Sequence, residues 1–444
     1  MTKIIQAPCT TMQKIKEKGI DRSVTPPIVD AIHLNISLPM YEKHVLSNGV
    51  ELYLFNMGTQ DTMMVNWIFD AGNWFEEKNL VASATNHMLK NGTTSRNAFA
   101  INEHFEFYGS YLNRNCYHET AEVTLHCLSK HVQELLPVVA ELINESILPE
   151  EELEIYKKNM QQRLKVNLQK NEFVASRMIE AYLFGEEHPY GRYSREEDYS
   201  NLNQPEIKEF FNRYYKNGRL VIFAAGVLPK NIVQQLEASF GKLPLKKHVG
   251  PENNLSFHAS SEKKFRIQNS VDGVQGSIRL GRYFPNRKHP DFPMMQVLNN
   301  VFGGFFGSRL MNNVREDKGY TYGINSYLMN HIQTSALMVS TEAGKDVCEP
   351  ALVEIYKEMD RLCNEPISED ELSLTRNYLI GSILSELDGP FQVAARWKNY
   401  ILNGLTEEYF YNSVRIIKEV RPRDLQEVAQ KYLNKNEFYE LVVT

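Results

Sequence analysis

Apolar and polar residues alternate along the chain with two periods, which predicts strands and amphipathic helices. The segment Val45 to Phe55 is typical of a strand, a turn at Asn48-Gly49 and a second strand. The two-residue period of strands also runs through 63–71 and 111–128, and the continuous apolar run 220–225 is typical of a short buried strand. Helical spacing predicts helices over four segments, which are 80–90, 98–108, 130–145 and 149–184. Asn91-Gly92 is typical of a helix C-terminus and ends the first of them.

The same order of elements returns in the second half of the chain. Segment 148–153 leads into a helix that ends at Tyr182 to Gly185, and segment 366–372 leads into one that ends at Tyr400 to Gly404. Segments 213–217 and 430–434 each precede a final short strand, and the offset is roughly 217 to 219 residues. Earlier in each half, Ser277 to Arg282 matches the strand at Met63, and Met294 to Phe302 matches the helix at Leu80. We therefore predict two copies of one domain.

These patterns define the predicted fold class and boundaries. Long helices with hairpin signals favour an α+β fold in which each repeat is a largely antiparallel sheet with helices packed on one face. A doubly wound parallel sheet would need regular strand–helix alternation and a glycine fingerprint, and neither is present. Residues 1–40, which include Thr25-Pro26-Pro27, form an extension, 41–242 and 259–444 are the two domains, and 243–258 is the linker.

Composition narrows the class of protein. At 444 residues, 42% hydrophobic and 23% charged, the chain is typical of a globular protein with more than one domain. Its net charge of −6 argues against a nucleic-acid binder. No apolar run is long enough for a membrane span, and residues 1–19 do not resemble a signal peptide, so we expect a cytoplasmic protein. The five cysteines, at positions 9, 116, 127, 348 and 363, are too few and too scattered for a disulfide framework.

The repeat, the helix at Leu80 to Thr93 and the segment Arg315 to Tyr322 together resemble the pitrilysin/insulinase-type inverted zinc peptidases. Within that family the chain is similar to the short bacterial group related to mitochondrial processing peptidase. The resemblance covers nearly all of residues 41–444 and implies the inverzincin type of fold. It also implies a peptide substrate and a partner of the same family.

The resemblance identifies a zinc motif whose ligands have been replaced. Active members carry His-x-x-Glu-His on this helix, because two histidines four residues apart share one helical face and can bind one zinc ion. Here the three positions hold Ser83, Asn86 and His87. The position of the distant third ligand falls near Leu164, and the nearest carboxylates, Glu154 and Glu172, lie more than two helical turns away. We therefore expect no zinc in this chain and a hydrogen-bonded structural role for His87.

Other histidines do not rebuild the site in the sequence. The four that cluster, at positions 104, 118, 126 and 131, include no pair at four-residue spacing on a helix. We expect them to be surface or capped side chains.

A second family feature is retained. The resemblance implies that Arg315 and Tyr322, seven residues apart, are the arginine and tyrosine that this domain supplies to an active site. Arginine can hold peptide carbonyls or a carboxylate with a charge-assisted fork, and a tyrosine hydroxyl can donate to a developing oxyanion. From spacing alone, the favoured interpretation is a surface ion-pair residue at Arg315, beside Glu316 and Asp317, with Tyr322 in the core. The repeat and the replaced zinc ligands reverse that preference.

Two further segments are implied to contact substrate. Gly303, Gly304 and Gly307 resemble the glycine-rich loop that the non-catalytic processing-peptidase subunit uses to touch substrate, although two phenylalanines make a helix-ending turn equally consistent. Active members hold substrate as an added strand, and the matching stretch here is Gly109 to Asn115. Backbone pairing requires no particular side chains, so the sequence neither supports nor excludes binding there.

These features predict a non-catalytic subunit of a heterodimeric zinc peptidase. The partner would be a homologous chain with an intact His-x-x-Glu-His motif and its own zinc, and the isolated chain could form homodimers. The alternative is a structural subunit with no peptidase role, like the core subunits of respiratory complexes that share this fold. A self-contained hydrolase is disfavoured because no Ser-His-Asp or Cys-His arrangement is evident.

Overall fold

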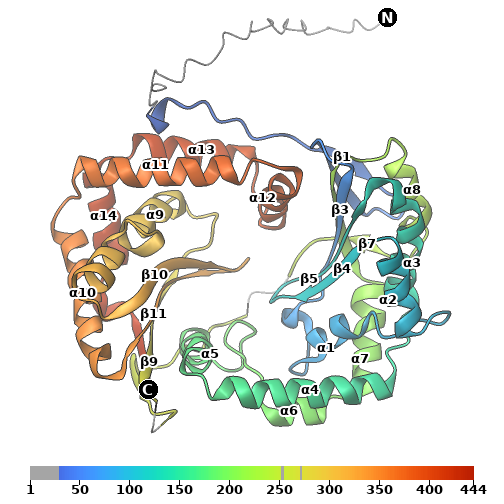
Figure 1. Cartoon of the computed structure of the whole chain (residues 1–444), viewed down its shortest axis with the longest axis horizontal. Coiled ribbons are helices and arrows are strands. Elements are labelled where there is room, and N and C mark those ends of the chain that lie inside the picture. The colour runs from blue at the N-terminus through green and yellow to red at the C-terminus, as the bar shows by residue number, and fades with distance from the viewer. Residues whose placement is uncertain (1–29, 252–254, 271–272) are drawn as a thin grey trace, which may run out of the picture.

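The hairpin at Asn48-Gly49 and the alternating strands of the first half form one sheet (Figure 1). The computed structural model describes residues 30–251, 255–270 and 273–444. The strands of the first sheet are β1 (Glu42–Val45), β2 (Glu51–Asn56), β3 (Thr62–Phe69), β4 (Tyr111–Cys116), β5 (Ala121–Leu128), β6 (Arg219–Gly226) and β7 (Lys246–Lys247). Their order is β1-β2-β6-β3-β5-β4, with β7 beside β6. All neighbours are antiparallel except β6, which runs parallel to β2 and β7.

The second sheet repeats this topology. Its strands are β8 (Lys264–Ile267), β9 (Gln275–Phe284), β10 (Thr321–Asn330), β11 (Ser335–Gly344) and β12 (Tyr439–Val443). The order β8-β12-β9-β11-β10 reproduces β2-β6-β3-β5-β4, and β12 with β8 is again the parallel pair. The structure thus confirms the two-fold repeat and the largely antiparallel sheets.

Each half carries its own set of helices. In the first half they are α1 (Val81–Met88), α2 (Ala98–Phe107), α3 (Val132–Glu145), α4 (Glu150–Leu168), α5 (Asn171–Phe184), α6 (Glu196–Asn201), α7 (Gln204–Phe211) and α8 (Ile232–Phe240). In the second half they are α9 (Phe292–Asn299), α10 (Cys348–Asn364), α11 (Glu369–Ser385), α12 (Pro390–Leu402), α13 (Glu407–Glu419) and α14 (Pro422–Tyr432). Short helical turns include η1 (Ala31–His33), η4 (Asn212–Lys216), η5 (Asn300–Gly304) and η6 (Met311–Asp317). In the first half, Trp67 of β3 packs against Phe240 of α8, with ring centroids 5.3 Å apart.

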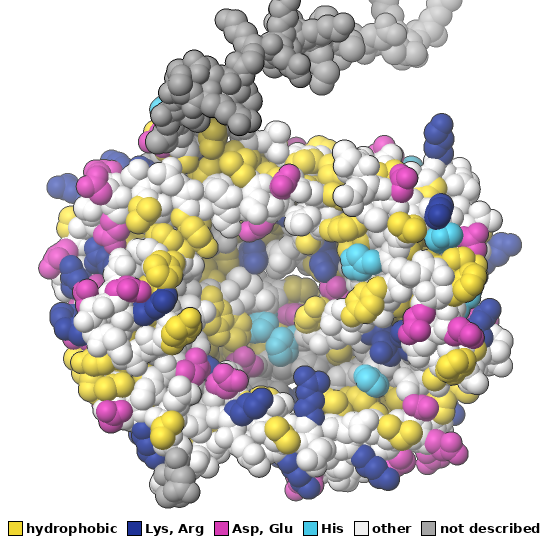
Figure 2. Space-filling view, viewed as in Figure 1, with side chains coloured by type: hydrophobic (Ala, Val, Ile, Leu, Met, Phe, Trp, Pro, Cys, Tyr) yellow, Lys and Arg dark blue, Asp and Glu magenta, His cyan; other side chains and the backbone are white. Residues whose placement is uncertain are grey.

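The opposite face of each sheet is covered by a helix from the other half. Trp397 of α12 belongs to the same buried cluster as Tyr53 and Phe223 of the first sheet. In return, Leu183 of α5 packs on the second sheet together with Met338. Helices therefore cover both faces, which extends the one-face packing expected from the sequence, and the two halves interlock around a central hollow (Figures 1 and 2).

Helix α5 packs so closely on the second sheet that position 281 requires glycine. A Cβ atom on Gly281 of β9 would lie 2.7 Å from Cδ1 of Leu183, inside van der Waals contact. Leu183 is fully buried, and burying such a side chain stabilises the fold by roughly 1.5–3 kcal/mol. The exchange of helices is thus a substantial part of the core.

The segment before β1 ties the first half to the second. Residues 1–29 of the predicted extension, including the Pro26-Pro27 break, lie outside the described residues. Within 30–40, Ile36 and Leu38 are buried among residues of the second half, and the indole of Trp397 donates to the Pro39 carbonyl at 2.7 Å. Part of the predicted linker, β7, adds to the first sheet. No helix in the described part of the chain has the length and apolar character needed to cross a bilayer.

One ion pair also joins the two halves. The Lys398 ammonium of α12 lies 3.0 Å from both carboxylate oxygens of Glu122 in β5. Glu122 is 6% exposed, and its carboxylate also accepts from the side-chain amide of Asn66 at 3.2 Å. Removing the lysine would leave a buried carboxylate without its counter-charge, which is costly.

We predict that Lys398→Met lowers the free energy of unfolding by ~1–3 kcal/mol, because Glu122 then keeps its desolvation cost without its cation. Urea-induced unfolding followed by circular dichroism measures the change. Adding Glu122→Gln should recover most of the loss, since an amide costs less to bury than an unpaired carboxylate. The matched control Arg415→Ala breaks an exposed pair with Glu419 and should change the value by less than ~0.5 kcal/mol. An unchanged Lys398→Met variant would contradict the prediction.

Candidate functional site

Helix α1, which carries the zinc-motif positions, is held by a carboxylate from the preceding loop. Leu80 precedes it in a left-handed conformation, φ +74°, and provides no side-chain cap. Glu76 replaces that cap by accepting from the backbone N–H of Leu80 at 3.3 Å and of Ala82 at 2.8 Å. Burial raises the pKa of Glu76 to about 7. The first turn of α1 is therefore anchored before Ser83.

Asn86 has a structural hydrogen-bond role. Its side chain is 3% exposed, and the amide donates to the Tyr215 hydroxyl at 3.1 Å and to the Glu122 carbonyl at 3.4 Å. An amide does not titrate, so this group cannot act as a general base. The position that would hold a catalytic glutamate instead connects α1 to β5 and η4.

His87 lies on the exposed side of α1. Its ring packs on Tyr156 of α4, with centroids 4.7 Å apart, and Arg114 of β4 donates to its backbone carbonyl. Burial against these groups and the nearby Arg114 charge lower the pKa of His87 to about 4, so the imidazole is neutral at pH 7. Within the described residues, packing on Tyr156 takes the place of the hydrogen bond expected from the sequence.

The remaining two positions do not complete a zinc ligand set. Leu164 of α4 is 5% exposed and belongs to the apolar core of the first half. The Ser83 hydroxyl donates to the Leu80 carbonyl at 3.1 Å. The donors that would face a metal are thus a hydroxyl, an amide and one imidazole, and this set does not fit catalytic zinc, which takes three strong ligands.

Tyr156 is the site residue that sequence reasoning missed. Its ring packs on His87, and burial raises its pKa. It lies eight residues before Leu164 on α4, so the two share a helical face. That spacing was the signal in the sequence that could have identified it.

The four histidines that cluster in the sequence have different contacts in the structure. His104 approaches the Glu134 carbonyl at 3.1 Å. His118 approaches the Pro189 carbonyl at 3.1 Å, and its half-buried ring contacts His331 of the second half, with centroids 4.7 Å apart. His126 contacts Phe391 edge-on, and His131 packs on Tyr108. Across residues 30–251, 255–270 and 273–444, no three His, Cys, Asp or Glu side chains are grouped so that they could hold a metal ion.

The structure brings Arg315 and Tyr322 together. The Arg315 guanidinium lies 5.3 Å from the Tyr322 ring centroid and 4.8 Å from that of Phe306, and it also reaches Glu316 at 3.3 Å. Tyr322, at the start of β10, is 91% exposed, and Phe306 is 62% exposed. An exposed tyrosine with a free hydroxyl does not fit the core role considered from spacing alone. We call Arg315, Phe306 and Tyr322 the arginine–aromatic cluster.

The three predicted substrate-contacting glycines have different surroundings. A Cβ on Gly303 would lie 2.7 Å from the Ser326 hydroxyl oxygen, so close packing alone requires glycine there. Gly304 ends η5 beside Asn300, and Gly307 lies against Phe305 near the arginine–aromatic cluster. Their contact with substrate stays a prediction.

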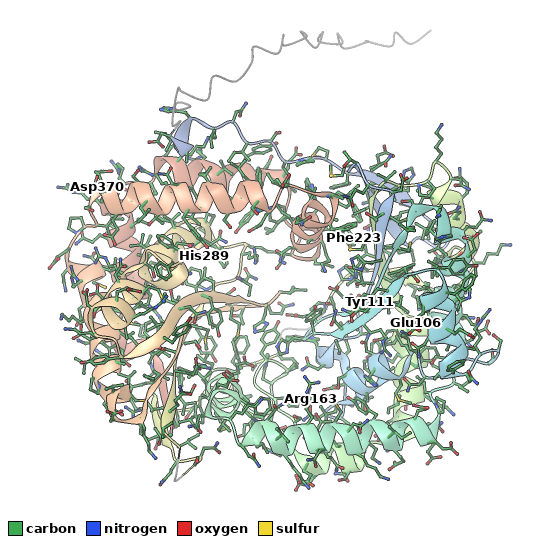
Figure 3. All side chains as sticks on the ribbon, viewed as in Figure 1. Glu106, Tyr111, Arg163, Phe223, His289 and Asp370 are labelled. Atoms are coloured by element: carbon green, nitrogen blue, oxygen red, sulfur yellow. The ribbon has the colours of Figure 1, made fainter. Side chains whose placement is uncertain are left out.

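The stretch matched to the substrate-binding strand is an open sheet edge. Residues 111–116 form β4, which pairs with β5 on one side and has no strand on its other side among the described residues. Tyr111, labelled in Figure 3, is 63% exposed on this strand. An extended peptide could add to such an edge through backbone hydrogen bonds.

Similarity to solved structures extends over nearly the whole chain. A peptidase M16 inactive domain from Pseudomonas fluorescens superposes with a TM-score of 0.79 at 22% identity, covering 91% of this chain and 98% of that one. A chain of complex III from Candida albicans gives a TM-score of 0.72 at 16% identity, covering 90% and 95%. At these identities the likeness establishes the fold.

Sequence comparison identifies the family. The zinc protease YmxG of Bacillus subtilis is 24% identical over 369 residues, covering 82% of this chain and 89% of that protein. The beta subunit of mitochondrial processing peptidase from Bos taurus is 24% identical over 379 residues, covering 81% and 75%. The model for insulinase, peptidase family M16, matches residues 54–191, and the model for the peptidase M16 inactive domain matches residues 201–379. Because the two matches together span more than half of the chain, it belongs to the insulinase-type M16 peptidase family.

Proposed function

We propose that this chain is the non-catalytic subunit of a heterodimeric M16 peptidase and lends Arg315 and Tyr322 to the zinc site of a homologous partner. The observation that carries the proposal is the arginine–aromatic cluster, in which an arginine and a tyrosine lie side by side on the surface. Both groups are available to a second molecule, while the zinc positions of the same chain hold Ser83, Asn86 and Leu164. The pair therefore has no reaction to serve within its own chain.

Each group has a defined task in peptide hydrolysis. The guanidinium of Arg315 would hold a peptide carbonyl or carboxylate, and packing between Phe306 and Tyr322 limits the conformations that it must lose on binding. The Tyr322 hydroxyl would donate to the oxyanion that forms on the scissile carbonyl at the partner's zinc. The partner supplies the metal, the water and the general base.

The peptide itself would lie in extended form. The free edge of β4 and the hollow between the halves offer backbone pairing and enclosed space in this subunit. Relatives named zinc protease and processing peptidase support a peptide as the substrate class.

The alternative is an assembly subunit without a peptidase role, and the similarity to a chain of complex III supports it at the level of the fold. That role requires a stable complex but makes no demand on Arg315 or Tyr322. Substitution of these two residues therefore separates the two functions.

We expect the purified chain alone to cleave no peptide, and a mixture with a homologue carrying His-x-x-Glu-His to cleave. In the mixture, Tyr322→Phe should lower kcat about a hundredfold, as loss of one oxyanion donor does. Arg315→Ala should lower kcat/KM by at least about tenfold through lost substrate binding. Cleavage of a quenched fluorogenic peptide measures both.

The matched controls are Tyr411→Phe and Arg415→Ala, which alter exposed residues of the same types on α13, away from the cluster. Complex formation, followed by size-exclusion chromatography with light scattering, should be the same for all variants. If the complex forms and cleaves while both cluster variants keep full activity, the proposed contribution to catalysis is wrong.

The lost zinc site gives a second prediction. The wild-type chain should purify with far less than one zinc per chain, whereas Ser83→His/Asn86→Glu/Leu164→Glu should bind about one, because it restores two imidazoles on one helical face and a third ligand. Zinc is measured by inductively coupled plasma mass spectrometry after dialysis. The control Ser83→His/Asn86→Glu/Leu164→Gln lacks the third carboxylate and should bind much more weakly. Stoichiometric zinc in the wild type would show that the ligands lie elsewhere.

A further inference from the structure

The second half contains a cavity of about 610 Å³ with both polar and apolar lining residues, within the range of small-ligand sites. Its walls come from α9 and η5, from β10, and from helices α11, α12 and α13. The loop before α9 also contributes, and Figure 3 labels His289 on that loop. Helix α12, which lines the cavity, borders the hollow between the two halves (Figure 1). The cavity is therefore near the space where we expect a peptide.

The repeat places this cavity where the zinc site lies in the first half. Ser95-Arg96 after α1 is matched by Ser308-Arg309 after α9, an offset of about 213 residues. The same offset relates Ser83, Asn86 and His87 to Gln296, Asn299 and Asn300, which line the cavity. The later offset, about 218 residues, relates Leu164 on α4 to Ser382 on α11, which also lines it. The first half fills the third-ligand position with a buried leucine, whereas the second half has a serine at a cavity wall.

Two arginines give the cavity a positive charge. Arg396 of α12 is paired with Glu386 and donates to the Tyr400 hydroxyl at 3.0 Å. Arg287 has no hydrogen bond or ion pair within the described residues, and its Nε atom is buried without a partner. Its guanidinium lies 5.7 Å from the centroid of the Phe292 ring. With Glu386 neutralising one of the two guanidinium groups, a net positive charge remains for a ligand.

Three oxygen atoms of cavity-lining residues are buried without a partner among the described residues. They are Oδ1 of Asn299, Oδ1 of Asn399 and the hydroxyl of Tyr409. Because these atoms are buried, a ligand in the cavity does not reach them, and the unpartnered group left for a ligand is the half-buried guanidinium of Arg287. A guanidinium donates charge-assisted hydrogen bonds to an anion, so the matching ligand carries an anionic group.

We propose that this cavity binds a carboxylate of a peptide, with the carboxylate on the guanidinium of Arg287. The carboxylate can come from the C-terminus or from an acidic side chain. The inference rests on the proposed role as a peptide-binding subunit, because it names the part of a peptide that this half would hold. It does not depend on zinc, on a partner or on cleavage.

The test is isothermal titration calorimetry of the full chain alone with three acetylated Gly/Ser peptides. One has a free C-terminus, one is its C-terminal amide, and one is the amide with a single Glu. The free acid should bind at least about tenfold more tightly than the plain amide, since a charge-assisted hydrogen bond is lost. Binding of the Glu amide would assign the carboxylate to a side chain, and its failure to bind would assign it to the C-terminus.

Two variants locate the binding. Arg287→Gln should weaken binding of the carboxylate peptide at least about tenfold without lowering the melting temperature, because no protein partner is lost. Ser382→Leu should also weaken binding, because it places in the cavity the side chain that Leu164 provides in the first half. The control Arg415→Gln removes a surface arginine outside the cavity and should bind as the wild type does.

Equal binding of all three peptides, absence of binding at millimolar concentration, or full binding by Ser382→Leu would overturn the proposal. The cavity is tested by peptide binding to the isolated chain through Arg287 and Ser382. The proposed catalytic contribution is tested by cleavage in the mixture through Arg315 and Tyr322, so the two proposals can fail separately.

Discussion

The structure depends on the exchange of one helix between its two halves. A sheet with apolar residues on both faces must bury both, and the helices of each half cover only one of them. Helix α12 covers the second face of the first sheet, where Figure 3 shows Phe223, and α5 does the same for the second sheet. Without the exchange, the faces that carry Phe223 and Met338 would be exposed apolar patches. The halves are therefore one cooperative unit with a hollow between them.

The exchange also connects the two candidate sites. Successive residues of α12 point in different directions, so one helix serves several surfaces. Trp397 packs on the first sheet, and Lys398 pairs with Glu122, whose backbone carbonyl accepts from Asn86. Arg396 and Asn399 of the same helix line the cavity of the second half. A shift of α12 would therefore alter the degenerate zinc site and the cavity together.

The sequence predicted the elements and their duplication well, because both depend on local patterns. The strand periods, the Asn48-Gly49 hairpin and the recurrence of Tyr182 at Tyr400 are all visible within short windows. The side-by-side placement of Arg315 and Tyr322 followed from the family resemblance, and their contact with a partner's site stays a prediction. What local patterns do not contain is the identity of the surface that a helix covers.

For that reason, two features could not be predicted from the sequence. The apolar stripe of α5 shows that Leu183 needs a buried environment, and it does not reveal that the second sheet provides it. Likewise, Arg287 looks like any surface arginine in the sequence, because its isolation results from residues that fold around it from α11, α12 and α13. Tyr156 was different, since its helical spacing from Leu164 was available in the sequence and was not used.

The two copies of the repeat differ at the position of the zinc site, which is filled by side chains in the first half and open as a cavity in the second. In the first half the site is filled: Leu164 is in the core, Asn86 is hydrogen-bonded, and Tyr156 packs against the remaining histidine. Each of these changes is stabilising without a ligand, since a buried leucine contributes roughly 1.5–3 kcal/mol. In the second half the half-buried guanidinium of Arg287 and the amide oxygens of Asn299 and Asn399 have no partner among the described residues, an arrangement that costs free energy. A fold optimised only for stability would have filled that cavity as it filled the first site. The unpartnered arginine is therefore better explained by a ligand than by packing.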